Sequence, residues 1–349
     1  MKHLSRRLAG LLVLFAALSL APNAFAQAGG TKPAPSLTPA PASASARQAA
    51  STSEPVVLET ATGKLYGTIE LPARASAPYP VVLIISGSGP TDRNGNSPLL
   101  PGANNSLKYL AEGLAAQGIA SLRYDKRGIA ESVMAAKAES DLRFDNYIED
   151  AVEWGRRLRA DRRFSTLVVA GHSEGSLIGM VAAERLGADG YVSIAGAGRR
   201  ADQTVLEQLK GQLPPELYAR SEEIFKLLVE GKTDADVPAP LAALFRPSVQ
   251  PYIISWLKYD PQKEIAKLNS PVLIAQGTHD LQVGEAEAKL LAAAKPSAKL
   301  LLVEGMNHVL KETPADPKQQ AASYSDPSLP DAPRLLSEVG SFVKGIKKR

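Results

Sequence analysis

The chain of 349 residues carries 40 lysines and arginines against 36 acidic residues, a net charge of +4, and 44% of its residues are hydrophobic. This length and composition allow a sizeable core, and the near balance of charge gives no sign of a strongly basic binding face. No cysteine is present, which excludes disulfides as a source of stability and cysteine-linked lipid anchors.

Residues 1–26 combine the features of a secretory signal peptide. Three basic residues precede an apolar run over residues 8–20, and small residues follow at the A-x-A positions that end at Ala26. The run is shorter than the roughly 20 apolar residues that span a bilayer, so no stable membrane anchor is expected. We expect cleavage after Ala26 and export to the periplasm or the medium of a bacterium. Loss of the three cations lowers the net charge to about +1, which indicates no nucleic-acid partner.

Residues 27–54 are mostly Ala, Pro, Ser and Thr. Such a segment buries too little apolar surface to offset the entropy cost of ordering, and is predicted to be a disordered linker. The pattern changes at Val56, and residues 55–349 are predicted to form one folded domain.

Short apolar runs alternate with amphipathic segments through this domain. Strands are predicted over residues 64–71, 81–85, 119–124, 167–170, 191–194, 271–275 and 299–303, and helices over residues 106–117, 147–158, 176–186, 285–294 and 333–347. Strands that are apolar throughout and separated by helices indicate an α/β fold, with a mostly parallel sheet of about eight strands and helices on both faces. The first two predicted strands have no helix between them, so we expect them to pair antiparallel at an edge.

One long insertion interrupts the alternation. About 70 residues of helix-prone sequence separate the strand that ends near Ala195 from the strand that begins at Pro271. A plain crossover needs far fewer residues, so residues 199–268 are predicted to form a helical lid.

The strongest chemical signal is the sequence Gly171-His172-Ser173-Glu174-Gly175, which joins a buried strand to a helix. A nucleophilic serine on a sharp strand-to-helix turn needs glycines on either side for close packing. The context therefore predicts that Ser173 is the nucleophile of a serine hydrolase.

A serine hydroxyl needs a base, and the chain has four histidines. His3 lies in the signal, His172 adjoins the nucleophile, and His279 reads as a neighbour of Asp280. His308 follows the last strand, at the sheet edge where sites of open α/β sheets form, and is predicted to be the base. Asp280 follows the preceding strand and is predicted to orient the imidazole, with Glu304 and Asp260 as rivals. The order Ser173, Asp280, His308 is that of the α/β-hydrolase fold.

The negative charge of a tetrahedral intermediate needs preorganised N–H donors. We expect one from the main chain of Glu174 and the other from Ser88, in the Ser-Gly-Ser-Gly turn after residues 81–85.

Several motifs now show a resemblance to a known family. The chain resembles bacterial lidded carboxylesterases, which are often described as serine aminopeptidase-like hydrolases. Five of its segments resemble that family's motifs, in the same order: ISGSGPTDRNG, RYDKRGIAES, GHSEGS, GTHDLQV and GMNHVLK. Ala130 stands where that family's turn has a glycine. The resemblance implies an α/β-hydrolase fold and hydrolysis of small or short-chain acyl esters, with no metal or organic cofactor. Asp125 and Arg127 are interpreted as scaffold, and Asp92 and Arg93 as a solvated loop pair.

Two alternatives stay open. The same residues can cleave peptides or amides, for which Glu222 and Glu223 of the lid are candidate anchors of a substrate amine. A non-enzymatic binding module is the other, since a fold does not dictate function. Six apolar lid residues are candidates for an acyl pocket, although packing of the lid itself is the commoner use: Leu241, Leu244, Phe245, Ile253, Ile254 and Trp256.

Overall fold

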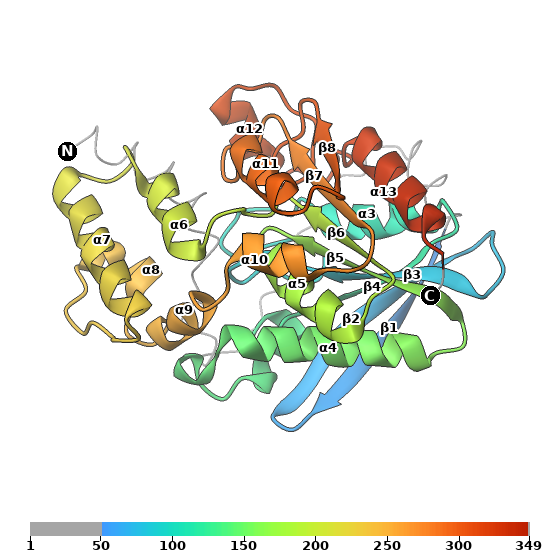
Figure 1. Ribbon diagram of the computed structural model, residues 1–349, viewed down its shortest axis with the longest axis horizontal. Coiled ribbons are helices and arrows are strands. Elements are labelled where there is room, and N and C mark those ends of the chain that lie inside the picture. Colours follow the sequence, from blue (N-terminus) through green and yellow to red (C-terminus); the bar gives the residue numbers. More distant parts are fainter. Residues whose placement is uncertain (1–50, 348–349) are drawn as a thin grey trace, which may run out of the picture.

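A computed structural model describes residues 51–347 (Figure 1). The expected signal peptide and nearly all of the expected linker lie outside the described residues. Eight strands form one sheet in the order β1-β2-β4-β3-β5-β6-β7-β8, which confirms the sheet size that was predicted. The strands are β1 (Ser51–Thr60), β2 (Gly63–Pro72), β3 (Tyr79–Ile85), β4 (Ala120–Tyr124), β5 (Phe164–His172), β6 (Gly190–Ile194), β7 (Val272–Gly277) and β8 (Lys299–Val303).

The antiparallel edge differs from the one predicted. β1 pairs with β2 and β2 with β4, both antiparallel, whereas β3 lies between β4 and β5 and is parallel to both. The expected pairing of residues 64–71 with residues 81–85 was therefore wrong. The reason is that β1 begins at Ser51, inside the expected linker, and supplies the partner strand. Its polar first half and Pro55 suit an edge strand, where a missing N–H breaks no ladder.

Helices cover both faces of the sheet, as predicted (Figure 1). On one face α3 (Ser106–Ala115) and α13 (Pro333–Gly345) pack on the strands in a single apolar cluster. On the other face the covering helices are α4 (Phe144–Ala160), α5 (Glu174–Leu186), α10 (Pro261–Lys267) and α11 (Glu285–Ala294). Burial on both faces explains why the central strands are apolar throughout.

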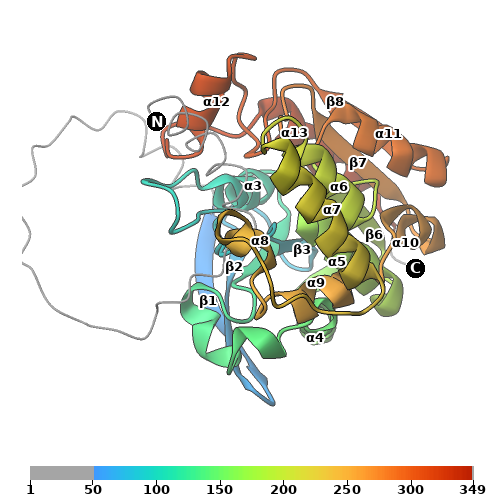
Figure 2. The same ribbon diagram turned by 90° about the vertical axis from the view of Figure 1, so that its left-hand side faces the viewer.

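The insertion between β6 and β7 forms a helical lid beyond one end of the sheet (Figures 1 and 2). It contains α6 (Ala201–Leu209), α7 (Pro215–Val229), η3 (Ala239–Leu241), α8 (Ala242–Phe245) and α9 (Gln250–Trp256). The lid is shorter than the predicted residues 199–268, because α10 packs against α5 and α11 in the layer that covers the sheet. Most of the candidate pocket residues form the lid's own core: Leu241, Leu244, Phe245 and Ile253 are buried.

The remaining elements are short. They are η1 (Ala130–Ala135), η2 (Glu139–Asp141) and α12 (Pro317–Ser323). Across residues 51–347, no helix combines the length and the apolarity that crossing a bilayer requires.

Candidate active site

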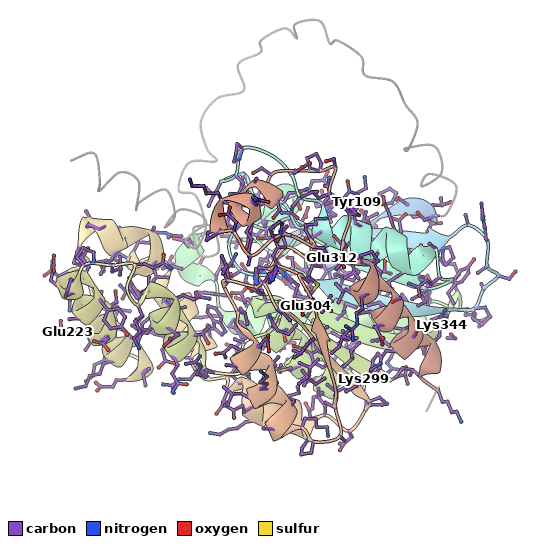
Figure 3. The ribbon with its side chains drawn as sticks, turned by 90° about the horizontal axis from the view of Figure 1, so that it is seen from above. Tyr109, Glu223, Lys299, Glu304, Glu312 and Lys344 are labelled. Carbon is purple, nitrogen blue, oxygen red and sulfur yellow. The ribbon has the colours of Figure 1, made fainter. Side chains whose placement is uncertain are left out.

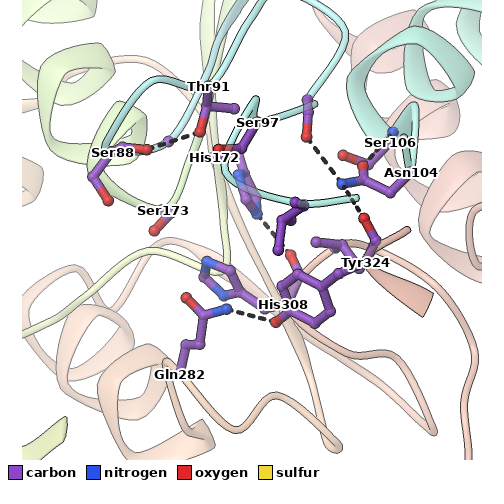
Figure 4. A pocket seen from close by; sticks show the side chains of 14 residues that line it. Ser88, Thr91, Ser97, Asn104, Ser106, His172, Ser173, Gln282, His308 and Tyr324 are labelled. Carbon is purple, nitrogen blue, oxygen red and sulfur yellow. Dashed lines mark hydrogen bonds between the residues drawn. The ribbon is translucent and has the colours of Figure 1, made fainter. Parts of the chain in front are cut away.

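Ser173 lies on a sharp turn between β5 and α5. Its backbone angles, φ 55° and ψ −123°, fall in a region that residues with a side chain rarely adopt. The main-chain N–H of Ser173 donates to the carbonyl of Ile194 at 2.9 Å, which ties the turn to β6. The turn presents the hydroxyl at the carboxyl edge of the sheet, where Ser173 and His308 line the same cleft and lie near each other (Figure 4).

The two flanking glycines are required by packing. A Cβ on Gly171 would lie 2.0 Å from the Gly175 carbonyl oxygen. A Cβ on Gly175 would lie 2.4 Å from the carbonyl oxygen of Ile85, at the end of β3. No side chain fits at either position, so the glycines allow the turn to pack against β3.

His308 and Asp280 come together at the ends of β8 and β7. The imidazole Nδ1 lies 2.8 Å from Oδ2 of Asp280, whose carboxylate is fully buried. The other carboxylate oxygen, Oδ1, accepts the main-chain N–H groups of Gln282 and Val283 at 2.8 and 2.9 Å. Because a carboxylate only accepts hydrogen bonds, the proton is on Nδ1, and Nε2 is left with a free lone pair.

The competing residues have other roles in the structure. His279 Nδ1 lies 2.6 Å from the carbonyl oxygen of Thr313, and His279 lines neither of the clefts that Ser173 lines. Asp260 caps α10 by accepting the N–H of Gln262. Glu304 is exposed. The structure thus brings His308 and Asp280 together and gives the competing residues other contacts.

His172 has a supporting place beside the base. Its Nε2 lies 2.8 Å from the His308 carbonyl oxygen, and the two ring centroids are 4.8 Å apart. Burial, with a further contribution from His308, lowers the pKa of His172 to about 3. His172 is thus neutral at physiological pH and contacts the main chain of His308.

The two expected oxyanion donors flank the nucleophile. Glu174 begins α5, Ser88 lies in the loop after β3, and both line a cleft together with Ser173. Within residues 51–347, neither main-chain N–H has a hydrogen-bond acceptor. Two unpaired amides beside a nucleophile are suited to hold an oxyanion.

Ser173 lines two clefts, which also share Ser88 and Gln282. The first cleft is lined mainly by polar, uncharged groups together with Ser173 and His308: Ser88, Thr91, Ser97, Asn104, Ser106, Gln282 and Tyr324 (Figure 4). The second cleft lies under the lid and combines apolar side chains, among them Leu177, Val205 and Trp256, with polar and charged ones, among them Thr204, Gln208 and Arg199. Of the lid residues proposed for an acyl pocket, Trp256 lines this cleft. No group of three or more histidine or acidic side chains within residues 51–347 is arranged to hold a metal ion.

The turn after β4 supports the loop that carries Ser88. The guanidinium of Arg93 pairs with Asp125 at 2.7 Å, and its main-chain N–H donates to the same carboxylate. The interpretation of Arg93 as part of a solvated pair was wrong, because its side chain is only 13% exposed. Arg127 pairs with the buried Asp150, in keeping with a scaffold role. Ala130 has φ 47°, the left-handed conformation that glycine favours.

Lys126 was missed by the sequence analysis. Its side chain is 1% exposed and contacts both Gly87 and Glu174, directly behind the expected oxyanion donors. A single lysine after a strand carries no pattern that would distinguish it from a surface residue.

Residues 103–313 match the family described as serine aminopeptidase, S33. The chain belongs to this family. Esterase EstD of Thermotoga maritima is 30% identical over 262 residues, which make up 72% of this chain. The chain spans 60% of the length of EstD.

Solved structures of two esterases share the architecture of this chain. Est1E of Butyrivibrio proteoclasticus, solved with ferulic acid bound, has a TM-score of 0.56 and 17% identity, over 83% of this chain and 96% of Est1E. A thermophilic esterase of Thermogutta terrifontis has a TM-score of 0.51 and 15% identity, over 84% and 99%. The predicted α/β-hydrolase fold is thereby confirmed.

Proposed function

We propose that this protein is a serine hydrolase that cleaves carboxylic esters of small or short-chain acyl groups through an acyl-enzyme on Ser173. One observation carries the proposal: the imidazole of His308, held at Nδ1 by the buried Asp280, lies in one cleft with Ser173 on its strained turn. The 30% identity to a protein named an esterase supports the same chemistry.

The proposed reaction follows from this geometry. Ser173 Oγ attacks the carbonyl carbon while Nε2 of His308 takes the hydroxyl proton, and Asp280 stabilises the resulting imidazolium. The main-chain amides of Ser88 and Glu174 bind the oxyanion. His308 then gives its proton to the leaving alkoxide. Water, deprotonated by the same imidazole, attacks the acyl-enzyme. The bond between Ser173 Oγ and the acyl carbon then breaks, His308 returns the proton to Oγ, and the acid is released.

The two clefts accept different parts of the ester. The second cleft contains the apolar side chains Leu177, Val205 and Trp256, and these suit a short acyl chain, because burial of hydrocarbon against them gains about 0.8 kcal/mol per methylene. The first cleft presents hydroxyl and amide groups and suits a polar leaving alcohol. Selectivity for acyl length is therefore expected to depend on residues under the lid.

An aminopeptidase is the second candidate, and the charges near Ser173 do not favour it. An exopeptidase of this kind needs a free carboxylate to bind the substrate ammonium. Among the described residues, the first cleft has no acidic side chain in its lining. The second cleft has Glu174, which is paired with Lys126. Glu222 and Glu223 are exposed on α7 and line neither cleft; Figure 3 shows Glu223 on the lid.

The test compares ester and amide turnover by the same protein. We expect hydrolysis of 4-nitrophenyl acetate and butyrate, with Ser173→Ala at the rate of the uncatalysed reaction. Amino-acid naphthylamides should turn over far more slowly than the esters. Preferred cleavage of the naphthylamides would support the peptidase instead. Failure of a fluorophosphonate probe to label Ser173 would support a binding module.

A further inference from the structure

The described chain holds a buried cation behind the expected oxyanion hole. Lys126 follows β4, and its ammonium donates to the Gly87 carbonyl oxygen at 2.6 Å and to Glu174 Oε2 at 2.7 Å. The Tyr147 ring centroid lies 5.0 Å from the same nitrogen. The Lys126 and Glu174 side chains are 1% and 3% exposed, so these contacts replace the water that an ammonium would otherwise bind.

Both acceptors of this ammonium are connected to an oxyanion donor. The Gly87 carbonyl belongs to the same peptide unit as the N–H of Ser88. The Glu174 carboxylate is the side chain of the residue whose main-chain N–H is the second donor. The Lys126 ammonium therefore contacts a group bonded to each oxyanion donor: the Gly87 carbonyl for Ser88 and the carboxylate for Glu174. The two donors follow β3 and β5.

The contact with Gly87 has a direct electrostatic effect. A cation at a carbonyl oxygen draws electron density through the peptide unit, which makes its N–H a stronger donor. It also holds the peptide plane, so that the N–H stays aimed at the reacting carbonyl without reorganisation. Neither effect requires Lys126 to touch the substrate.

Glu174 continues this network to the lid. Its Oε1 accepts the Tyr252 hydroxyl of α9 at 2.5 Å. Burial, together with the charge of Glu174, raises the pKa of Tyr252 well above its usual value, so the hydroxyl keeps its proton and donates. The carboxylate thus has one partner in the sheet domain and one in the lid.

We propose that Lys126 is a positioning residue that orients and polarises the Ser88 amide and, through Glu174, sets the start of α5 for oxyanion binding, with Tyr252 tying this arrangement to the lid. The inference rests on the proposed function only in that Ser173 reacts through an oxyanion.

The test removes the network without leaving a buried unpaired charge. In the double variant Lys126→Met/Glu174→Gln, both charges are lost while the side chains keep a similar size. The matched control is Arg123→Met/Glu70→Gln, a buried ion pair with a 3.0 Å contact between β4 and β2. Each protein is assayed for kcat and KM with 4-nitrophenyl acetate, and for the rate at which a fluorophosphonate labels Ser173. Circular dichroism and thermal unfolding monitor the fold.

We expect the Lys126 double variant to fold, with kcat and labelling rate about 100-fold lower and KM changed less than about threefold, as for loss of an oxyanion donor. The control should be less stable but keep the parental kcat per labelled site. Tyr252→Phe should show a smaller loss of kcat, since Lys126 still holds Glu174. A folded double variant with parental kcat and labelling rate would overturn the inference.

The labelling rate separates this inference from the proposed function. If the parent labels readily but cleaves no ester, ester hydrolysis is refuted and the effect of Lys126 is still measured on labelling. If the parent does not label at all, Ser173 is not an activated nucleophile, and both proposals are refuted.

Discussion

The side chain of His172 donates a hydrogen bond to the main-chain carbonyl of His308, with 2.8 Å between Nε2 and the oxygen. Because a carbonyl can only accept, His172 carries its proton on Nε2 and leaves Nδ1 bare. The residue before the nucleophile thus contacts the backbone of the proposed base. The ring must stay neutral in the folded protein, since its burial penalises the imidazolium.

This neutral histidine predicts a dependence of stability on pH. Below pH 6.5 the unfolded chain takes up a proton at His172, whereas the folded chain does not until about pH 3. Stability from this group is complete above pH 6.5 and falls by about 1.4 kcal/mol per pH unit as the pH drops toward 3. His172→Gln keeps a side-chain donor but does not titrate. Urea unfolding at pH 7, 5.5 and 4.5 should show the parent losing more stability than the variant; equal slopes would contradict a buried neutral His172.

Asp280→Asn should reduce kcat by about 10³- to 10⁴-fold, because an amide N–H at Nδ1 favours the wrong imidazole tautomer. The fold should persist, since the substitution keeps the shape of the side chain. Glu304→Gln is the matched control, an exposed acid four residues from His308, and should retain parental activity. The measurement is kcat of both variants and of the parent in steady-state kinetics with 4-nitrophenyl acetate. An Asp280→Asn enzyme within tenfold of the parent would mean that another group orients His308.

Gly175→Ala should cost at least about 3 kcal/mol of stability, because the new methyl group meets main-chain oxygen of Ile85 that cannot move away. Gly284→Ala serves as its counterpart: φ is −79°, and no atom lies within 4 Å of the added carbon. Thermal unfolding should show a large fall for the first variant and almost none for the second. A Gly175→Ala protein as stable as Gly284→Ala would disprove the close approach of the turn to β3.

Val205→Trp should shorten the acyl chain that the enzyme accepts, because Val205 lines the second cleft from α6. We expect kcat/KM to fall about tenfold or more for butyrate and hexanoate esters, with acetate changed little. Val229→Trp introduces the same side chain on the exposed face of α7 and should leave the acyl profile unaltered. Equal losses for acetate and hexanoate would place the acyl chain elsewhere.

The elements that sequence predicted well are those whose pattern has one physical cause. The central strands are buried on both faces and apolar throughout, and the helix over residues 285–294 and the strand over residues 299–303 were predicted to the residue. The Ser173 turn was recognisable because the chemistry needs glycines at fixed spacing. β1 was missed because an edge strand buries few side chains, so Ser51–Thr60 resembles linker at its start.

Contacts between distant segments were beyond prediction from the chain. Lys126 and Glu174 are separated by 48 positions, and Tyr252 lies a further 78 positions along, in the lid. Their residue types are ordinary for surface positions, and only the fold makes them neighbours in a buried network. The same holds for Arg93 and Asp125. Arg93 was predicted to be solvated, because nothing in the sequence indicates its contact with Asp125.

The backbone conformation of Ser173 predicts that an inactive variant is more stable than the active protein. A residue with a side chain at φ 55° and ψ −123° costs about 1–3 kcal/mol, whereas glycine adopts these angles freely. Ser173→Gly should therefore melt at a higher temperature than both the parent and Ser173→Ala, and a lower melting temperature would contradict the assigned turn. Selection of this protein for heat resistance alone would then favour loss of the nucleophile, so any engineering for thermostability has to screen for turnover in the same step.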